Sequence, residues 1–94
     1  MPRLFTQEEL DRALDDLSGW HFHRGAIRIH IQAPDFPAAV ALVGAIAAVA
    51  EEMNHHPDID IRWKDVTLRL STHSAGGLTQ KDLDLASEIN ALAP

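Results

Sequence analysis

Residues 58–70 read DIDIRWKDVTLRL, and apolar and polar side chains alternate along most of this stretch. The apolar members are Ile59, Ile61 and Trp63, followed by Val66, Leu68 and Leu70. Alternation with a period of two is typical of strands that bury one face, and the polar pair Lys64-Asp65 interrupts it where a turn is needed. The stretch therefore predicts a β-hairpin with one apolar face, in which Trp63 is by default a core residue.

A second alternating stretch, residues 20–32, reads WHFHRGAIRIHIQ and breaks at Arg24-Gly25, which predicts another hairpin. Trp20 lies on its apolar side and is also expected in the core. His21, His23 and His30 lie on its polar side. We expect these histidines on a solvated sheet face, or at an interface if subunits stack through that face, and we assign them no catalytic role.

Three other segments carry helix signals. They run from Thr6 to about Leu17, from Asp35 to about Asn54, and from Thr79 to near the C-terminus. The first and third begin with a capping box, completed by Glu9 and Asp82, and the second has Asp35 as N-cap and Pro37 in its first turn. The apolar residues expected to face the core are Leu10, Leu14 and Leu17 in the first helix; Phe36, Val40, Val43, Ala47, Ala50 and Met53 in the second; and Leu85, Ile89 and Leu92 in the third.

The resulting order, α-β-β-α-β-β-α, predicts an α+β two-layer sandwich: a four-stranded antiparallel sheet with the helices packed on one face. A chain of 94 residues has the length of one domain, spanning 1–94. Such a short chain forms only a modest core, and its sheet keeps an open face and open edges. We therefore expect it to associate with further copies of itself.

Composition excludes several classes of function. The net charge is −6 with only eight Lys and Arg residues, so we expect no nucleic-acid partner. Cysteine is absent, which excludes disulfides, zinc–thiolate sites and cysteine nucleophiles. The longest apolar segment, residues 38–50, is too short to cross a bilayer, and the N-terminal residues lack the apolar stretch of a signal peptide. The sequence thus predicts a cytoplasmic protein with no membrane partner.

Three histidines mark the candidate site. His55 and His56 come at the expected end of the second helix, Pro57 stops that helix directly after them, and His73 follows in a polar loop. The reference pKa of histidine is about 6.5, so an imidazole can give or take a proton near neutral pH. The β-hairpin between His56 and His73 can bring both loops to one end of the sheet. Proton-transfer chemistry is therefore indicated, although histidines that only complement a helix dipole would look the same.

The spacing of these residues, Glu51-x3-His55-His56-Pro57-x5-Trp63-x9-His73-x8-Asp82, resembles that of the pterin-4a-carbinolamine dehydratase family. Segments outside this motif also resemble the family, among them Leu17-Ser18-Gly19-Trp20 and Ser71-Thr72-His73, so that the resemblance covers nearly the whole chain from about Leu10 to Leu92.

The resemblance implies a hydro-lyase that dehydrates a 4a-hydroxytetrahydropterin to a quinonoid dihydropterin, without a metal or another cofactor. It implies that His55 and His73 act as acids for the two faces of the pterin, and that His56 mainly binds and orients it. It places Trp63 near the pterin pocket, alongside Glu51, Pro57 and Asp82 as binding residues. It also raises a homotetramer, built as a dimer of dimers, above a plain dimer.

Other interpretations of these residues stay open. Asp82 is also the capping residue of the last helix, and Glu51 either orients an imidazole or is a solvated charge. Three histidines could bind zinc, but the three contain neither a His-x-His nor a His-x-x-x-His pair. The whole chain could also be a non-catalytic binding or assembly protein of the same fold. Degenerate relatives of that kind lose motif histidines, whereas this chain keeps all three.

Overall fold

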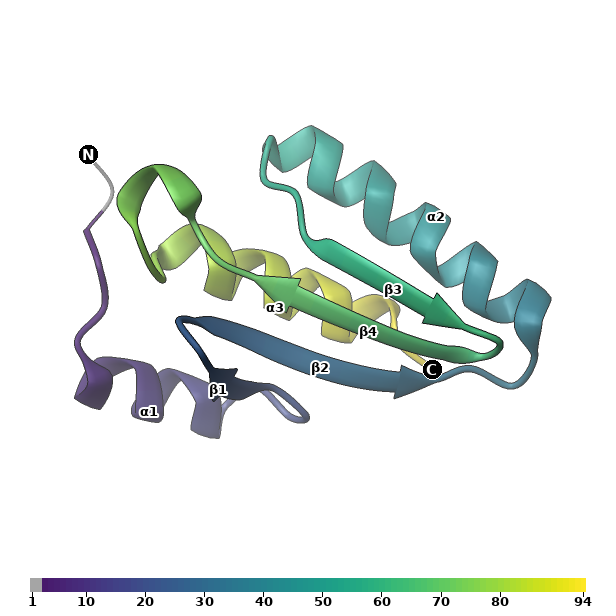
Figure 1. The fold of residues 1–94 in the computed structure, drawn as a ribbon, viewed down its shortest axis with the longest axis horizontal. Helices are drawn as coiled ribbons and strands as arrows, with labels where there is room; N and C mark the ends of the chain where they lie inside the picture. Colours follow the sequence, from purple (N-terminus) through teal and green to yellow (C-terminus); the bar gives the residue numbers. More distant parts are fainter. Residues whose placement is uncertain (1–2) are drawn as a thin grey trace.

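The computed structural model describes residues 3–94; Met1 and Pro2, which begin the N-terminal segment used for the location prediction, lie outside the described residues. Within this range the elements follow in the predicted order (Figure 1). They are α1 (Gln7–Asp15), β1 (His21–His23), β2 (Ala26–Gln32), α2 (Phe36–Met53), β3 (Asp58–Arg62), β4 (Asp65–Leu70), a short 3-10 helix η1 (His73–Ala75) and α3 (Gln80–Leu92).

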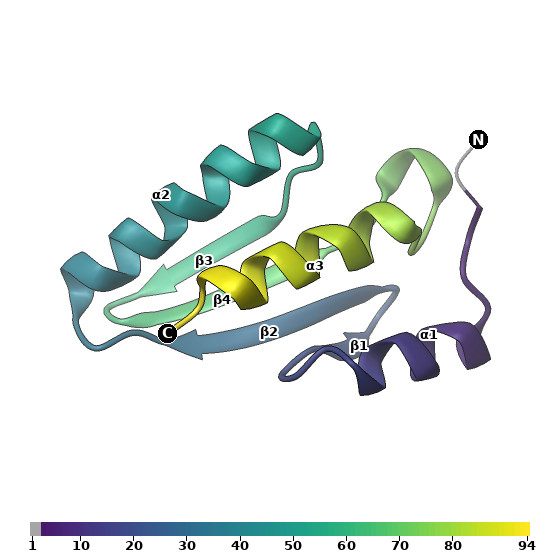
Figure 2. The ribbon, with the colours of Figure 1, turned by 180° about the vertical axis from the view of Figure 1, so that it is seen from behind.

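The four strands form one antiparallel sheet in the order β1-β2-β4-β3. The two predicted hairpins are therefore joined through β2 and β4 at the centre, with β3 at one edge and the three-residue β1 at the other. Seen from behind, α3 crosses in front of the sheet between α1 and α2, so the helices cover one face (Figure 2). The predicted α+β two-layer sandwich is confirmed.

Strand alternation builds the core as predicted. The inward residues of the central strands, Ile27, Ile29 and Ile31 on β2 and Val66, Leu68 and Leu70 on β4, are all buried. They pack against Leu85 and Ile89 of α3. Trp20 is also buried, and its indole Nε1 donates a hydrogen bond of 2.9 Å to Oδ1 of Asn90, which satisfies its polar atom inside the core.

The core-facing side of α2 differs from the prediction. Its buried residues are Ala39, Leu42, Ile46 and Ala50, of which only Ala50 was predicted to face the core. The predicted Phe36 and Val40 are 51% and 47% exposed, and Ala47 is exposed as well. Nearly every residue of α2 is apolar, so no polar face defined the rotation of the helix in the sequence. The side that faces the core carries Leu42 and Ile46 between two alanines, and the exposed side beyond Val40 consists mainly of alanine and glycine.

The end of α1 and the burial of Leu92 also differ from the prediction. The helix α1 ends at Asp15 rather than Leu17, although Leu17 still packs against the core. Leu92, predicted to be buried, is 38% exposed in the last turn of α3.

The apolar segment that was judged too short for a bilayer is part of α2, an 18-residue helix with a mean hydropathy of 1.6. By length and composition alone α2 could span a membrane, so the absence of a membrane partner stays a prediction.

Trp63 is not a core residue. The strand β3 ends at Arg62, and Trp63 with Lys64 forms the two-residue turn, one position earlier than predicted. Trp63 is 67% exposed and has φ +56°, and the Lys64 ammonium lies 4.5 Å from the centre of its ring. A two-residue hairpin turn needs positive φ, and glycine usually occupies such a position. The position of Trp63 is therefore set by the hairpin turn and not by the alternation of apolar residues along the strand.

Two substitutions of Trp63 that both remove the indole should measure the cost of the left-handed backbone at this turn. Both Trp63→Gly and Trp63→Val remove the ring, but only valine keeps a Cβ in the left-handed region, at a cost of about 1–2 kcal/mol. We expect Trp63→Val to have a free energy of unfolding lower by about 1 kcal/mol than Trp63→Gly. Urea denaturation of the two variants side by side measures the difference. Equal stabilities would show that the turn adapts to either residue.

Candidate active site

The end of α2 sends the two adjacent histidines in different directions. Asn54 caps the helix in the left-handed conformation, with φ +50°. The backbone N–H of His55 donates to the Ala50 carbonyl at 3.0 Å, which closes the last turn around this cap. Beyond the cap the chain is no longer helical, so His55 turns into the interior while His56 stays at the surface.

His55 meets a buried carboxylate. Its Nε2 lies 2.6 Å from Oδ1 of Asp82, and the two residues are 8% and 0% exposed. The second oxygen, Oδ2, accepts hydrogen bonds from the Thr72 hydroxyl at 2.7 Å and from the Thr79 backbone N–H at 2.9 Å. The Thr72 and Thr79 hydroxyl oxygens are 2.8 Å apart. Asp82 therefore caps α3, as predicted, and also anchors His55.

This pairing defines how His55 can act. An ionised carboxylate only accepts hydrogen bonds, so the imidazole presents an N–H at Nε2 and keeps Nδ1 for another partner. A carboxylate behind a histidine orients the ring and fixes its tautomer. His55 is thus a firmly held imidazole, and its Nδ1 has no hydrogen-bond partner among residues 3–94.

His56 is held more loosely. Its Nε2 lies 2.9 Å from Oε2 of Glu51, and the two side chains are 57% and 81% exposed. Glu51 thus orients His56 and not His55, although His55 is the residue one helical turn after Glu51 in the sequence. Exposed pairs of this kind contribute little stability, because water and salt screen them.

His73 begins a compact loop after β4. The Thr72 backbone N–H donates to the Gly77 carbonyl at 2.9 Å, and Gly76 adopts φ +76°, which lets the chain turn back directly after η1. The N-terminal segment supports this loop from outside, since the Phe5 N–H donates to the Leu78 carbonyl at 3.0 Å. Thr72 therefore holds the His73 loop through its backbone and Asp82 through its side chain.

The three histidines line one hollow of about 330 Å³. Its other lining residues are Asn54, Ser71, Thr72, Ser74 and Lys81. Glu51 and Asp82 lie behind the lining histidines as their partners. Pro57 and Trp63 are not among the lining residues, and Trp63 lies at the far end of the β3–β4 hairpin from His73. Within one chain, the structure does not bring Trp63 to this site.

The remaining polar lining was not found from the sequence. Asn54 and Lys81 are each adjacent to a motif residue, but neither has a periodicity or spacing that marks it. Lys81 stands in the first turn of α3, where the helix dipole disfavours a cation. A lysine at the start of a helix next to a capping aspartate was the one available signal. Among residues 3–94, no cluster of three or more His, Asp or Glu side chains is arranged to hold a metal ion.

The arrangement suits proton transfer on a small polar molecule. The hollow combines imidazoles of different exposure with the hydroxyl groups of the His73 loop and the ammonium of Lys81. General acids and bases of this kind act on a ligand within hydrogen-bond distance.

Known proteins are similar to this chain in sequence and in fold. The family model described as "Pterin 4 alpha carbinolamine dehydratase" matches residues 3–92. Proteins named "Putative pterin-4-alpha-carbinolamine dehydratase" are similar to this chain. The one from Roseiflexus castenholzii is 51% identical over 92 residues, which cover 98% of this chain and 99% of the relative. The one from Nocardia farcinica is 53% identical over 90 residues, which cover 96% and 95%.

A crystal structure described as a transcriptional coactivator/pterin dehydratase from Brucella melitensis superposes with a TM-score of 0.95. It is 33% identical, and the match covers 98% of this chain and 100% of that one. The fold and the hollow define a small α+β protein with a histidine-lined site. The chain belongs to the pterin-4-alpha-carbinolamine dehydratase family.

Replacing Thr72 with valine tests the buried network. Valine has nearly the same shape but no hydroxyl, so Oδ2 of Asp82 loses one of its two donors and the buried Thr79 hydroxyl loses its hydrogen-bond partner. An unsatisfied buried polar group costs about 1–3 kcal/mol, and we expect the free energy of unfolding to fall by this amount. Chemical denaturation measures it, with Thr72→Ser as the control that restores the hydroxyl. If serine and valine destabilise the protein equally, the hydroxyl has no part in the network.

Proposed function

We propose that this chain is a hydro-lyase that dehydrates a 4a-hydroxytetrahydropterin to a quinonoid dihydropterin, in the recycling of a tetrahydropterin such as tetrahydrobiopterin. The observation that carries the proposal is that His55, His56 and His73, the three histidines of the family motif, line one hollow. Membership of a dehydratase family supports the reaction class. We also place the enzyme in the cytoplasm, in keeping with its composition.

The reaction needs an acid and a base in suitable positions. The hydroxyl group on the tetrahedral ring carbon leaves as water once an acid protonates it, and the electron pair of the neighbouring ring nitrogen expels it. A base, or water, then takes the proton from that nitrogen, which completes the carbon–nitrogen double bond. No electrons are exchanged with a second reactant, so histidine side chains are sufficient for this chemistry.

The histidines differ in ways that suit separate roles. We assign the acid for one pterin face to His55, whose Nδ1 is free while Nε2 is held by Asp82. We assign the acid for the other face to His73, on the opposite loop. His56 is exposed and flexibly paired with Glu51, which suits binding and orientation of the ring more than proton transfer in a fixed geometry.

The double variant His55→Ala/His73→Ala tests these roles. Each acid contributes about 10²–10⁴-fold, so we expect kcat/KM to fall by at least about 10²-fold and by more than in either single variant. Dehydration of a synthetic carbinolamine measures it, after subtraction of a buffer blank at matched pH, because the reaction also proceeds uncatalysed. The control is His30→Ala, on the open sheet face. A folded double variant with near-wild-type kcat/KM would contradict the mechanism while leaving the family assignment intact.

We further propose that the enzyme is a homotetramer, built as a dimer of dimers. Two surfaces support this proposal. The outer side of α2 is apolar, with Phe36 and Val40 about half exposed, and the edge of β3 has no neighbouring strand among residues 3–94. Exposed apolar patches and open strand edges commonly mark subunit interfaces. A dimer through one of these surfaces alone is the fallback.

Pairing through β3 would also account for the position of Trp63. Two copies of an edge strand can pair antiparallel about a two-fold axis. If the axis passes near Asp60, the middle residue of β3, Trp63 of one protomer comes opposite the Pro57 end of its partner's strand. Trp63 would then reach the hollow of the partner, next to the His56 loop, although it is remote from the hollow of its own chain.

Subunit complementation tests this arrangement. If Trp63 acts across the interface, Trp63→Ala and His73→Ala are each impaired alone, but a hybrid dimer of the two contains one complete site. We expect co-expression to restore about a quarter of wild-type activity, because half of random dimers are hybrids with one of two sites intact. Light scattering establishes the oligomeric state in parallel. A monomer, or a mixture no more active than its components, would contradict the arrangement.

The second candidate is a binding or assembly protein that uses the same fold. The Brucella melitensis relative is described as a transcriptional coactivator as well as a pterin dehydratase, and the apolar side of α2 offers a surface for a partner. Retention of all three motif histidines favours the enzyme. Wild-type protein that fails to accelerate carbinolamine dehydration above the buffer blank would favour the binding protein.

A further inference from the structure

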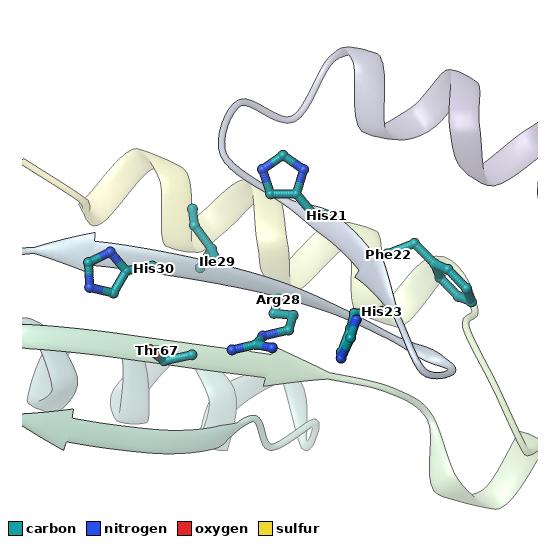
Figure 3. A pocket seen from close by; sticks show the side chains of 7 residues that line it. All are labelled: His21, Phe22, His23, Arg28, Ile29, His30 and Thr67. Carbon is teal, nitrogen blue, oxygen red and sulfur yellow. The ribbon is translucent and has the colours of Figure 1, made fainter.

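The open face of the sheet carries a second hollow, of about 300 Å³, that the proposed reaction does not use. It is lined by His21, Phe22 and His23 of β1, Arg28, Ile29 and His30 of β2, and Thr67 of β4 (Figure 3). The imidazoles and the guanidinium project from neighbouring strands around a common space. None of the lining residues belongs to the hollow that holds His55, His56 and His73.

Two arginines face each other at this hollow against the usual rules of strand pairing. In the sheet register Arg28 lies directly opposite Arg69 on one side and His21 on the other. Like charges directly opposite on one sheet face are destabilising. Arg69 is partly compensated, since it donates to the Arg24 carbonyl at 2.9 Å and lies 3.8 Å from an oxygen of Asp58. Within residues 3–94, Arg28 forms no ion pair.

The carboxylates of the same face do not neutralise Arg28. Asp60 on β3 pairs with Arg62 at 3.3 Å, and Asp65 on β4 pairs with His30 at 3.1 Å. The lining itself contains no Asp or Glu, although the whole chain carries 14 of them and only eight Lys and Arg. A cationic hollow on an acidic protein is therefore a local feature, and an anion would relieve the repulsion between Arg28 and Arg69.

We propose that this hollow binds a small molecule carrying a dianionic oxyanion, such as a phosphoryl or sulfate group. The Arg28 guanidinium offers a fork of N–H donors that matches such a group, and His21 and His23 add donors from β1. The volume is at the lower end of the range for small-molecule sites. The proposal does not rest on dehydratase activity.

Titration with sulfate and with phenyl phosphate, followed by NMR of backbone amides, tests the site. Both anions should shift the resonances of β1 and β2 saturably. Arg28→Gln removes a charged donor and should weaken both by about tenfold or more. The matched control is Arg62→Gln, another exposed arginine on the same sheet face, which should leave binding unchanged.

A further readout separates loss of the site from loss of folding. Arg28→Gln should not lower the Tm of the anion-free protein, since it removes a like-charge pair with Arg69. If Arg28→Gln folds as stably as the wild type, a loss of anion binding results from the missing guanidinium and not from unfolding.

Several results would overturn the proposal. Equal weakening by Arg28→Gln and Arg62→Gln would mean that the anions respond only to overall charge. Shifts confined to the His73 loop would place the anion in the other hollow. Tighter binding of a single-stranded oligonucleotide than of phenyl phosphate would assign the face to a polymer. Loss of anion binding on self-association would assign it to a second copy of the chain.

Discussion

A carboxylate with no exposure to solvent must be fully hydrogen-bonded, and in this protein that constraint falls on Asp82. Its partners come from three places: His55 after α2, Thr72 after β4, and the backbone of Thr79 at the start of α3. The same contacts that satisfy the carboxylate therefore fasten the end of one helix, the end of a central strand and the start of another helix to one another. Removing one partner of a buried charged pair typically costs about 3–5 kcal/mol, so this junction contributes to the fold as well as to the site.

The three imidazoles of the hollow are one residue type in three environments. His55 is buried and held at one ring nitrogen, His56 is exposed beside a solvated carboxylate, and His73 is exposed in a loop whose backbone is closed by Thr72 and Gly77. Rigid placement suits an acid that must meet its substrate in one geometry, and exposure suits a group that first contacts the ligand. The left-handed residue Asn54 makes the difference between the adjacent His55 and His56, because it ends the helix before both.

The molecule leaves several surfaces without a partner. The helices cover one sheet face only (Figure 2), β3 has a free edge within residues 3–94, and α2 leaves Phe36 and Val40 about half exposed. Trp63 adds a large exposed aromatic ring at the tip of the β3–β4 hairpin. These exposed features lie outside a buried apolar cluster that extends from α1 to α3, and they are the basis of the proposed subunit association. The open sheet face differs from the other surfaces, because its side chains are polar and its charges are unevenly distributed.

The sequence by itself determined the order of elements, the inward faces of the central strands, both capping boxes and the grouping of three histidines. These features follow from local periodicity and capping chemistry, which a single segment expresses alone. The tertiary structure alone decided which side of α2 faces the core, because a helix apolar on every side has no preferred face until it meets a sheet. It also decided that His55 pairs with Asp82, that Glu51 pairs with His56, and that Trp63 stands at a turn remote from the hollow. Hydrogen bonds between residues far apart in sequence, and the positive φ that a two-residue turn requires, depend on how the strands pair, and strand order has no signal in the sequence.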